Sequence, residues 1–154
     1  MEQKNKYHYV QSIFCGALVL LLAVIIAGYA LGVRIYAVQT GSMEPDLPVG
    51  SLIVVKPAKF DSINEGDVIT FEVSGSVVTH RVAQVDRKEM TFVTKGDMNT
   101  SNDASAVDYD SVIGRLWISL KYVGYPILLM GNRAVKTAVI AFFIIIIGVV
   151  IVKR

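Results

Sequence analysis

The chain has 154 residues, a formal net charge of +2 and a hydrophobic share of 53%, which is high for a water-soluble protein. This length allows one modest domain together with membrane anchors. The basic residues form no stripe, which excludes a nucleic-acid-binding protein. The single cysteine, Cys15, lies in an apolar run, which excludes a disulfide framework.

The first element in the chain is a long apolar run. Residues 12–33 carry no charge, and as a helix they would extend about 33 Å, enough to cross the hydrocarbon of a bilayer. The alternative, a cleavable signal peptide, has an apolar core of only about 7–15 residues. We therefore predict a transmembrane helix at residues 12–33, preceded by a cytoplasmic N-terminus at residues 1–11.

A second, shorter apolar run lies near the C-terminus, with basic residues on both sides. We predict a second transmembrane helix at residues 134–152, with residues 153–154 in the cytoplasm. A buried strand or an interfacial segment is the alternative for a run of this length. Because Lys and Arg at both chain ends favour the cytoplasmic side, residues 34–133 are expected on the extracytoplasmic face of the cell membrane, or of the endoplasmic reticulum membrane in a eukaryote.

Between the two apolar runs, short segments rich in β-branched and aromatic residues alternate with turns. We predict strands at residues 52–56, 68–72, 77–85, 91–95 and 112–119, with a hairpin turn at residues 74–76. This spacing favours a compact, mostly antiparallel β domain over βαβ units. Residues 96–110 have no periodicity, and a loop of this length in a small domain is more often functional than idle.

Aromatic residues follow the last predicted strand. Trp117, Tyr122 and Tyr125 lead into the apolar residues 126–130, which we interpret as a loop. Aromatic side chains just before a membrane span are typical of a surface that rests in the headgroup layer. The lipid bilayer is therefore an expected partner.

One serine lies on a constrained bend, in the sequence Thr40-Gly41-Ser42-Met43-Glu44-Pro45. Gly41 permits a tight backbone and Pro45 fixes the exit of the bend. A hydroxyl on such a bend can point at a ligand together with the neighbouring backbone N–H, as acyl-transfer enzymes require. An ordinary polar turn is the alternative interpretation.

The chain has only two histidines. His8, on the cytoplasmic side, is expected to be a solvated residue. In a strand, Val78, His80 and Val82 would share one apolar face, where a histidine is usually a core residue. An imidazole, with an unperturbed pKa of about 6.5, nevertheless suits proton transfer from serine at neutral pH, whereas a lysine at about 10.4 would need strong desolvation.

The predicted long loop offers two acids that could orient an imidazole, Asp97 and Asp103. Asp97, after Gly96, could equally be a turn residue that bonds its own backbone. The Asp and Asn oxygens would suit calcium, but the EF-hand Gly and terminal Glu are missing. With no cysteine and a single histidine in residues 34–133, zinc is also disfavoured. We expect no metal and no cofactor.

Three short motifs occur in order: Gly41-Ser42-Met43-Glu44-Pro45, then Thr79-His80-Arg81-Val82, then Lys95-Gly96-Asp97 with Asp103 six residues later. Together they resemble type I signal peptidase, in the endoplasmic-reticulum-type branch that also includes archaeal and SipW-like enzymes. The resemblance covers most of the chain. It implies a β-rich catalytic domain that removes signal peptides on the outer face of the membrane.

By position in the motifs, the resemblance implies that Ser42 is the nucleophile, His80 the general base and Asp103 the acid of the triad. Asp97 matches a nearby acidic position. Thr40 occupies the place of a hydroxyl that helps form the oxyanion hole with the Ser42 N–H. Met43 is expected to contribute to substrate binding.

The leading hypothesis is a membrane-bound serine endopeptidase that cleaves signal peptides after small-x-small sites. Its expected partners are signal-peptide-bearing preproteins and other membrane subunits. The alternative of a different class is a non-catalytic, membrane-anchored β domain that binds or presents secreted partners, with Ser42 and His80 apart. A third possibility is a dyad in which the base is Lys56, Lys95 or Lys121.

Overall fold

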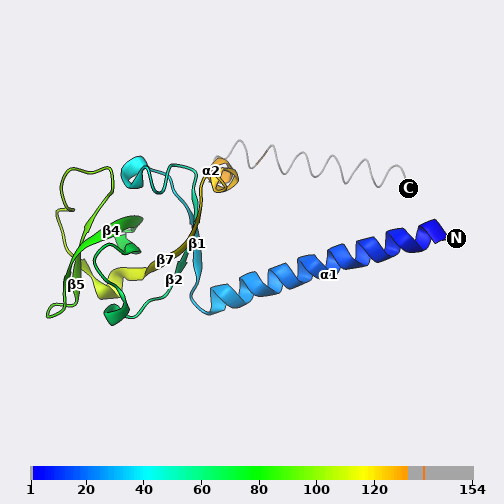
Figure 1. Cartoon of the computed structure of the whole chain (residues 1–154), viewed down its shortest axis with the longest axis horizontal. Coiled ribbons are helices and arrows are strands. Elements are labelled where there is room, and N and C mark those ends of the chain that lie inside the picture. The colour runs from blue at the N-terminus through cyan, green and yellow to red at the C-terminus, as the bar shows by residue number, and fades with distance from the viewer. Residues whose placement is uncertain (1, 132–136, 138–154) are drawn as a thin grey trace. The chain divides into compact units, whose positions relative to one another are not determined.

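A computed structural model describes residues 2–131 and residue 137 (Figure 1). The chain divides into two compact units between Arg34 and Ile35. In the described residues, the first unit is one long helix and the second carries nearly all of the β structure. The predicted second transmembrane helix at residues 134–152, except residue 137, and residues 153–154 lie outside the described part.

The N-terminal helix, α1 (Glu2–Ala30), contains a stretch that is long and apolar enough to cross a bilayer, Ser12–Ala30. Within the described residues no other helix has this length and composition. The helix begins before residue 12 and ends before residue 33, because the chain turns at Gly32, whose φ of 83° is typical of a residue just past a helix end.

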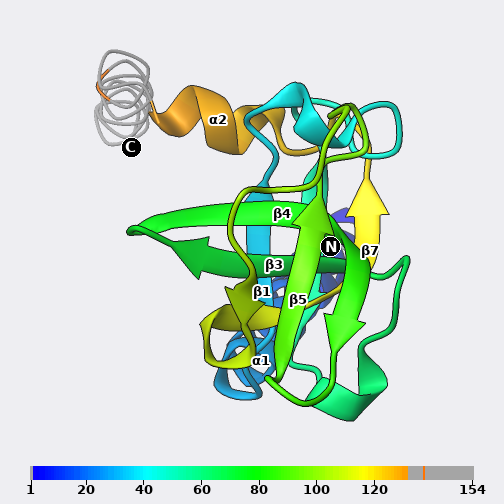
Figure 2. The ribbon, with the colours of Figure 1, turned by 90° about the vertical axis from the view of Figure 1, so that its left-hand side faces the viewer.

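The second unit is built on one seven-stranded sheet. Its strands are β1 (Arg34–Ala37), β2 (Leu52–Lys56), β3 (Val68–Val73), β4 (Ser76–Asp86), β5 (Thr91–Lys95), β6 (Val107–Asp108) and β7 (Val112–Leu120). The order across the sheet is β1-β2-β7-β3-β4-β5-β6, and Figure 2 shows β3 and β4 running side by side as a hairpin. From β2 to β6 every neighbouring pair is antiparallel, which confirms the predicted mostly antiparallel β domain.

Two segments differ from the sequence-based expectations. The predicted loop at residues 96–110 contains β6, whose two residues pair with β5 and are too short to give a periodic signal. The apolar residues after β7 form a short helix, α2 (Tyr125–Gly131), rather than a loop. Pro126 is compatible with this helix because it lies in the first turn, where its missing N–H has no intrahelical partner.

The apolar side chains form two core clusters. The first contains Phe60, Ile63, Ile69, Phe71, Val82, Phe92 and Val107, and the second contains Met43, Leu47, Ile53, Val55 and Val68. β7 touches both, because Val112 packs against the first cluster and Leu116 against the second. The strand that joins the two halves of the sheet therefore also joins the two halves of the core.

Strand β7 approaches β2 unusually closely at Gly114. A Cβ atom at this position would overlap the carbonyl group of Lys56 in β2. The register of the β2–β7 pair also shifts between Val54 and Val55. Only a residue without a side chain allows the two backbones to pass at this distance.

Candidate active site

Ser42 lies on a single turn of 3-10 helix, η1 (Gly41–Met43). Met43 is buried in the second core cluster, so a packed side chain fixes the turn. The Ser42 carbonyl oxygen accepts a hydrogen bond from the Met98 N–H, 2.9 Å away. A Cβ atom on Gly96 would lie 2.7 Å from the same oxygen, so a glycine is required where the loop after β5 meets the serine turn.

His80 lies in β4, next to the residue at which pairing with β5 begins. Its Nε2 atom is 3.2 Å from the Ser42 Oγ atom, although Ser42 lies on a turn between β1 and β2 and His80 lies in β4, on the other side of β7 in the sheet. The imidazole ring packs edge-on beside Phe71, with 6.4 Å between ring centroids, and its side chain is only 12% exposed. The ring is thus half-buried against an aromatic side chain and hydrogen-bonded to the serine at the same time.

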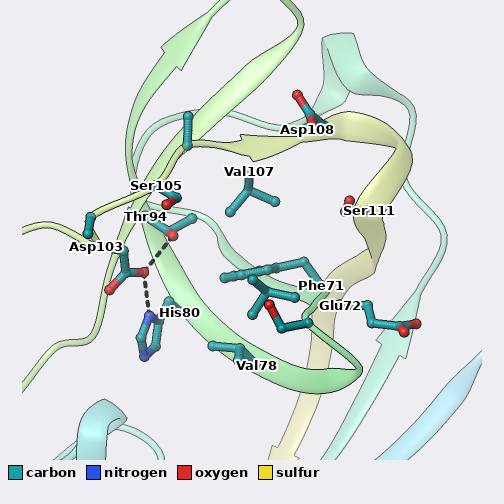
Figure 3. A pocket seen from close by; sticks show the side chains of 14 residues that line it. Phe71, Glu72, Val78, His80, Thr94, Asp103, Ser105, Val107, Asp108 and Ser111 are labelled. Atoms are coloured by element: carbon teal, nitrogen blue, oxygen red, sulfur yellow. Dashed lines mark hydrogen bonds and ion pairs between the residues drawn. The ribbon is translucent and has the colours of Figure 1, made fainter.

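Asp103 contacts the other ring nitrogen of His80. The distance from His80 Nδ1 to Asp103 Oδ2 is 2.6 Å, and the same oxygen accepts a hydrogen bond of 2.6 Å from the buried Thr94 hydroxyl (Figure 3). Because an ionised carboxylate can only accept hydrogen bonds, Nδ1 carries the ring proton in this arrangement. The Nε2 atom is then the acceptor that faces the Ser42 hydroxyl.

Asp97 contacts an arginine instead. Its Oδ1 and Oδ2 atoms accept hydrogen bonds of 2.8 Å and 2.7 Å from the Nε and Nη2 atoms of Arg81. Arg81 Nη2 also reaches Asp46, 2.9 Å away, in the chain segment that follows the serine turn. The hydrogen bond with Asp97 raises the pKa of Arg81, which therefore stays charged. Of the two acids that the sequence offered, Asp103 contacts the imidazole and Asp97 fixes its own loop to Arg81.

Thr40 and the three lysines considered as bases are the next candidates to place. The Thr40 Oγ1 atom lies 3.5 Å from the Ser42 Oγ atom, so the two hydroxyl groups are neighbours. The three lysines considered as bases occupy other surroundings: Lys56 lies over an aromatic ring, Lys121 donates to a backbone carbonyl, and Lys95 lines a separate small hollow. The group that the structure brings to the serine hydroxyl is the imidazole of His80.

A groove of about 610 Å³ runs past the serine turn. Two chain segments line it. One is residues 36–40, the end of β1 and the three residues after it, and the other is residues 76–80, the first half of β4. β1 is an edge strand, and in the described part of the chain β4 pairs with β5 only from Arg81 onward. The groove is therefore lined by two strand edges, by apolar side chains of the second core cluster including Met43, and by Ser42.

Sequence reasoning missed two contributors to this geometry, Thr94 and Arg81. Thr94 directly precedes the Lys95-Gly96-Asp97 motif, and Arg81 directly follows His80. A threonine or an arginine in a strand gives no sign of what its side chain will contact. Only the position of Thr94 beside one motif and of Arg81 within another could have indicated either residue.

Residues 9–92, more than half of the chain, match the family described as signal peptidase, peptidase S26. The matched stretch contains Ser42 and His80. The chain belongs to this signal peptidase family, which confirms the resemblance drawn from the three motifs.

Similarity to individual proteins points to the same branch. The chain is 38% identical over 85 residues to signal peptidase I W of Bacillus subtilis (strain 168), covering 53% of this chain and 45% of the relative. It is 32% identical over 110 residues to the signal peptidase complex catalytic subunit SEC11C of Canis lupus familiaris and of Homo sapiens, covering 64% of this chain and 57% of each relative. The chain thus spans about half the length of these curated relatives.

Proposed function

We propose that this chain is a membrane-bound serine endopeptidase that cleaves signal peptides from secreted preproteins after small-x-small sites. One observation carries the proposal. The two nitrogens of His80 join the Ser42 hydroxyl, at 3.2 Å, to the Asp103 carboxylate, at 2.6 Å. A serine, an imidazole and a carboxylate linked in this order form the arrangement that activates a serine for acyl transfer. Membership of the signal peptidase family supports the substrate class.

In the proposed reaction, the Ser42 Oγ atom attacks the carbonyl carbon of the scissile peptide bond while His80 Nε2 takes the hydroxyl proton. Asp103 holds the Nδ1–H group and stabilises the positive imidazolium. When the tetrahedral intermediate collapses, the C–N bond breaks and His80 gives its proton to the leaving amine. A water molecule then attacks the acyl ester on Ser42, with His80 again as the base, and releases the signal peptide as a carboxylic acid.

The negative oxygen of the tetrahedral intermediate needs hydrogen-bond donors. We assign this role to the Ser42 N–H and the Thr40 hydroxyl, whose oxygen lies 3.5 Å from the attacking Ser42 Oγ atom. A single donor of this kind is worth about 3–4 kcal/mol of transition-state stabilisation in serine proteases. Thr40 is therefore part of the proposed catalytic machinery.

The groove supports binding of the substrate as an extended strand. In the described part of the chain, β1 is an edge strand and residues 76–80 do not pair with β5, so these two edges can pair with the backbone of the segment that contains the cleavage site. The apolar side chains beside them, Met43 included, suit the small residues at the first and third positions before the cut. Backbone pairing explains how one groove can accept many preproteins.

The membrane part of the proposal rests on the apolar stretch Ser12–Ala30 of α1 and on the predicted second span at residues 134–152. Both termini would lie in the cytoplasm and the β domain on the extracytoplasmic face. Exposed Trp117, Tyr122 and Tyr125 suit contact with the headgroup layer. The SEC11C relatives are named catalytic subunits of a signal peptidase complex, which supports other membrane subunits as partners.

The proposal is tested by cleavage of a preprotein with the full-length chain reconstituted in phospholipid vesicles. Ser42→Ala and His80→Ala are each expected to lower kcat by roughly 10⁴-fold or more, because the members of a triad act as one unit. The matched controls are Ser101→Ala, in the exposed loop, and His8→Ala, at the only other histidine, both with wild-type rates. Wild-type cleavage by Ser42→Ala would remove the serine mechanism, and wild-type cleavage by His80→Ala would remove the imidazole as base.

A further inference from the structure

A second cavity, of about 510 Å³, lies beside the His80–Asp103 pair (Figure 3). Phe71, Val78 and Val107 form its apolar wall, and the Asp103 and Thr94 side chains lie next to His80. We call this cavity the Phe71 pocket. The role proposed above for the groove does not use it.

The Phe71 pocket and the groove border different core clusters. Phe71 and Val107 belong to the first core cluster, whereas the groove is lined by Met43 and other members of the second. The two cavities nevertheless share Val78 and His80. The first half of β4 is therefore a partition with one cavity on each side.

A peptide bound in extended conformation along residues 76–80 places its side chains alternately on the two sides of this partition. Residues 76–80 keep one edge unpaired in the described part of the chain, and a peptide that pairs with this edge adds a strand to the sheet. Successive side chains of a strand point to opposite faces. If the first and third residues before the cut point into the groove, the residue between them points to the face on which the Phe71 pocket lies.

We infer that the Phe71 pocket is a substrate subsite for the middle residue of the small-x-small site, and that it selects an apolar side chain there. This inference rests on the proposed function. The three apolar side chains of the wall offer a branched aliphatic group a place out of water. Apart from His80, the ionisable residues that line the pocket are all acidic, Glu72, Asp103 and Asp108, so an acidic substrate side chain is disfavoured.

The inference is tested with peptides that differ only in the middle residue, which is glycine, leucine or aspartate. The enzyme is the full-length chain in phospholipid vesicles, and kcat/KM is measured for each peptide. We expect the leucine peptide to be cleaved roughly 10–100-fold more efficiently than the glycine peptide, the usual range for filling an apolar pocket. The aspartate peptide is expected to be the poorest substrate.

A variant that fills the pocket from its rim provides the second measurement. Ala106 is exposed and lines the Phe71 pocket, so Ala106→Phe narrows the cavity without changing the core. This variant should reduce the preference for leucine over glycine about tenfold. The control is Ser101→Phe, in the same loop, because Ser101 is exposed and lines neither cavity. It should keep the wild-type preference.

The outcomes separate this inference from the proposed function. Equal kcat/KM values for the glycine and leucine peptides, or an unchanged preference in Ala106→Phe, overturn the subsite while cleavage itself supports the peptidase. Absence of cleavage of every peptide by the wild-type chain overturns the proposed function, and the subsite with it.

Discussion

Two hydrogen bonds meet at one oxygen of Asp103, one from His80 Nδ1 and one from the Thr94 hydroxyl. Thr94 is fully buried in β5, and its carbonyl oxygen also accepts the Asp103 N–H at 2.8 Å. The rigid strand therefore fixes both the backbone and the carboxylate of Asp103. An acid that is held in this way can orient the imidazole without moving itself, so Thr94 is a positioning residue in the proposed triad.

Removing only the Thr94 hydroxyl tests this role. Thr94→Val keeps the shape of the side chain, so we expect normal folding and a kcat/KM for preprotein cleavage that is about tenfold lower, equal to one lost hydrogen bond. Thr94→Ser keeps the hydroxyl and should stay within about threefold of the wild type. Equal losses of activity in the serine and valine variants would contradict a specific role for the hydroxyl, because the serine variant keeps it.

At the scale of single residues, the sequence predicted the members of the site but not how the acids are used. Ser42 could be chosen because Gly41 and Pro45 constrain its bend, and His80 because it is the only histidine in the sequence of residues 34–133. Asp97 and Asp103 occur in the same polar segment, and their spacing does not say which one meets the ring. Arg81 donates hydrogen bonds to both carboxylate oxygens of Asp97, whereas Asp103 contacts the imidazole. No local sequence pattern reveals the Arg81–Asp97 contact.

Among the elements, β7 is the one on which the geometry of the site most depends. It pairs with β2 on one side and with β3 on the other, and its side chains touch both core clusters. The serine turn packs into the cluster beside β2, whereas His80 and Asp103 belong to the half that starts with β3. The distance between Ser42 and His80 therefore depends on how β7 joins the two halves.

Gly114→Ala tests this dependence. A methyl group at this position would overlap the Lys56 carbonyl, so the β2–β7 pair has to shift. We expect the free energy of unfolding to fall by about 1–3 kcal/mol, as for other overpacked positions. The midpoint of thermal unfolding, followed by circular dichroism in detergent, measures this change, and kcat should fall as well.

Gly131→Ala is the matched control for Gly114→Ala. A Cβ atom at Gly131 meets nothing within 4 Å, so this variant should unfold and cleave like the wild type. A Gly114→Ala protein with normal stability would show that β2 and β7 tolerate a wider separation. Normal cleavage by a destabilised Gly114→Ala protein would separate the site from the β7 junction.

Most strands could be predicted because each is a run of β-branched and aromatic residues ended by a turn. The β3–β4 hairpin is an example, since Ser74 and Gly75 both have positive φ, as their turn requires. The order of the strands could not be predicted, because the placement of β7 between β2 and β3 depends on contacts far apart in the sequence. The loop predicted for residues 126–130 is wrong, because a short apolar run does not distinguish a loop from one or two turns of helix.

At the scale of the whole molecule, the apolar stretch of α1 is expected to control access to the substrate. An enzyme and a signal peptide held in the same bilayer meet at a high effective concentration, which compensates for weak binding in the groove. The helix should therefore matter more for membrane-embedded preproteins than for short soluble peptides.

Leu21→Arg combined with Leu22→Arg tests this role, because each arginine costs about 2.5–3.5 kcal/mol at the centre of a membrane helix. Because the predicted second span at residues 134–152 would keep the double variant in the membrane, the measured quantity is its activity. We expect it to lose most of its cleavage of membrane-embedded preprotein and to keep its cleavage of a short soluble peptide. The control, Leu21→Ala with Leu22→Ala, should cleave both substrates like the wild type. Wild-type cleavage of the embedded preprotein by the double variant would contradict the role of α1 in access to the substrate.

The place of β7 in the sheet also has a consequence for timing. A ribosome makes Ser42 early, His80 and Asp103 later, and β7 only after all three, yet β7 lies between the half that carries the serine and the half that carries the other two. A nascent chain that ends before Leu120 has no strand to join those halves. If Ser42, His80 and Asp103 act as the proposed triad, the order of synthesis keeps Ser42 inactive until the β domain is nearly finished, and it sets the moment at which the proposed cleavage can begin.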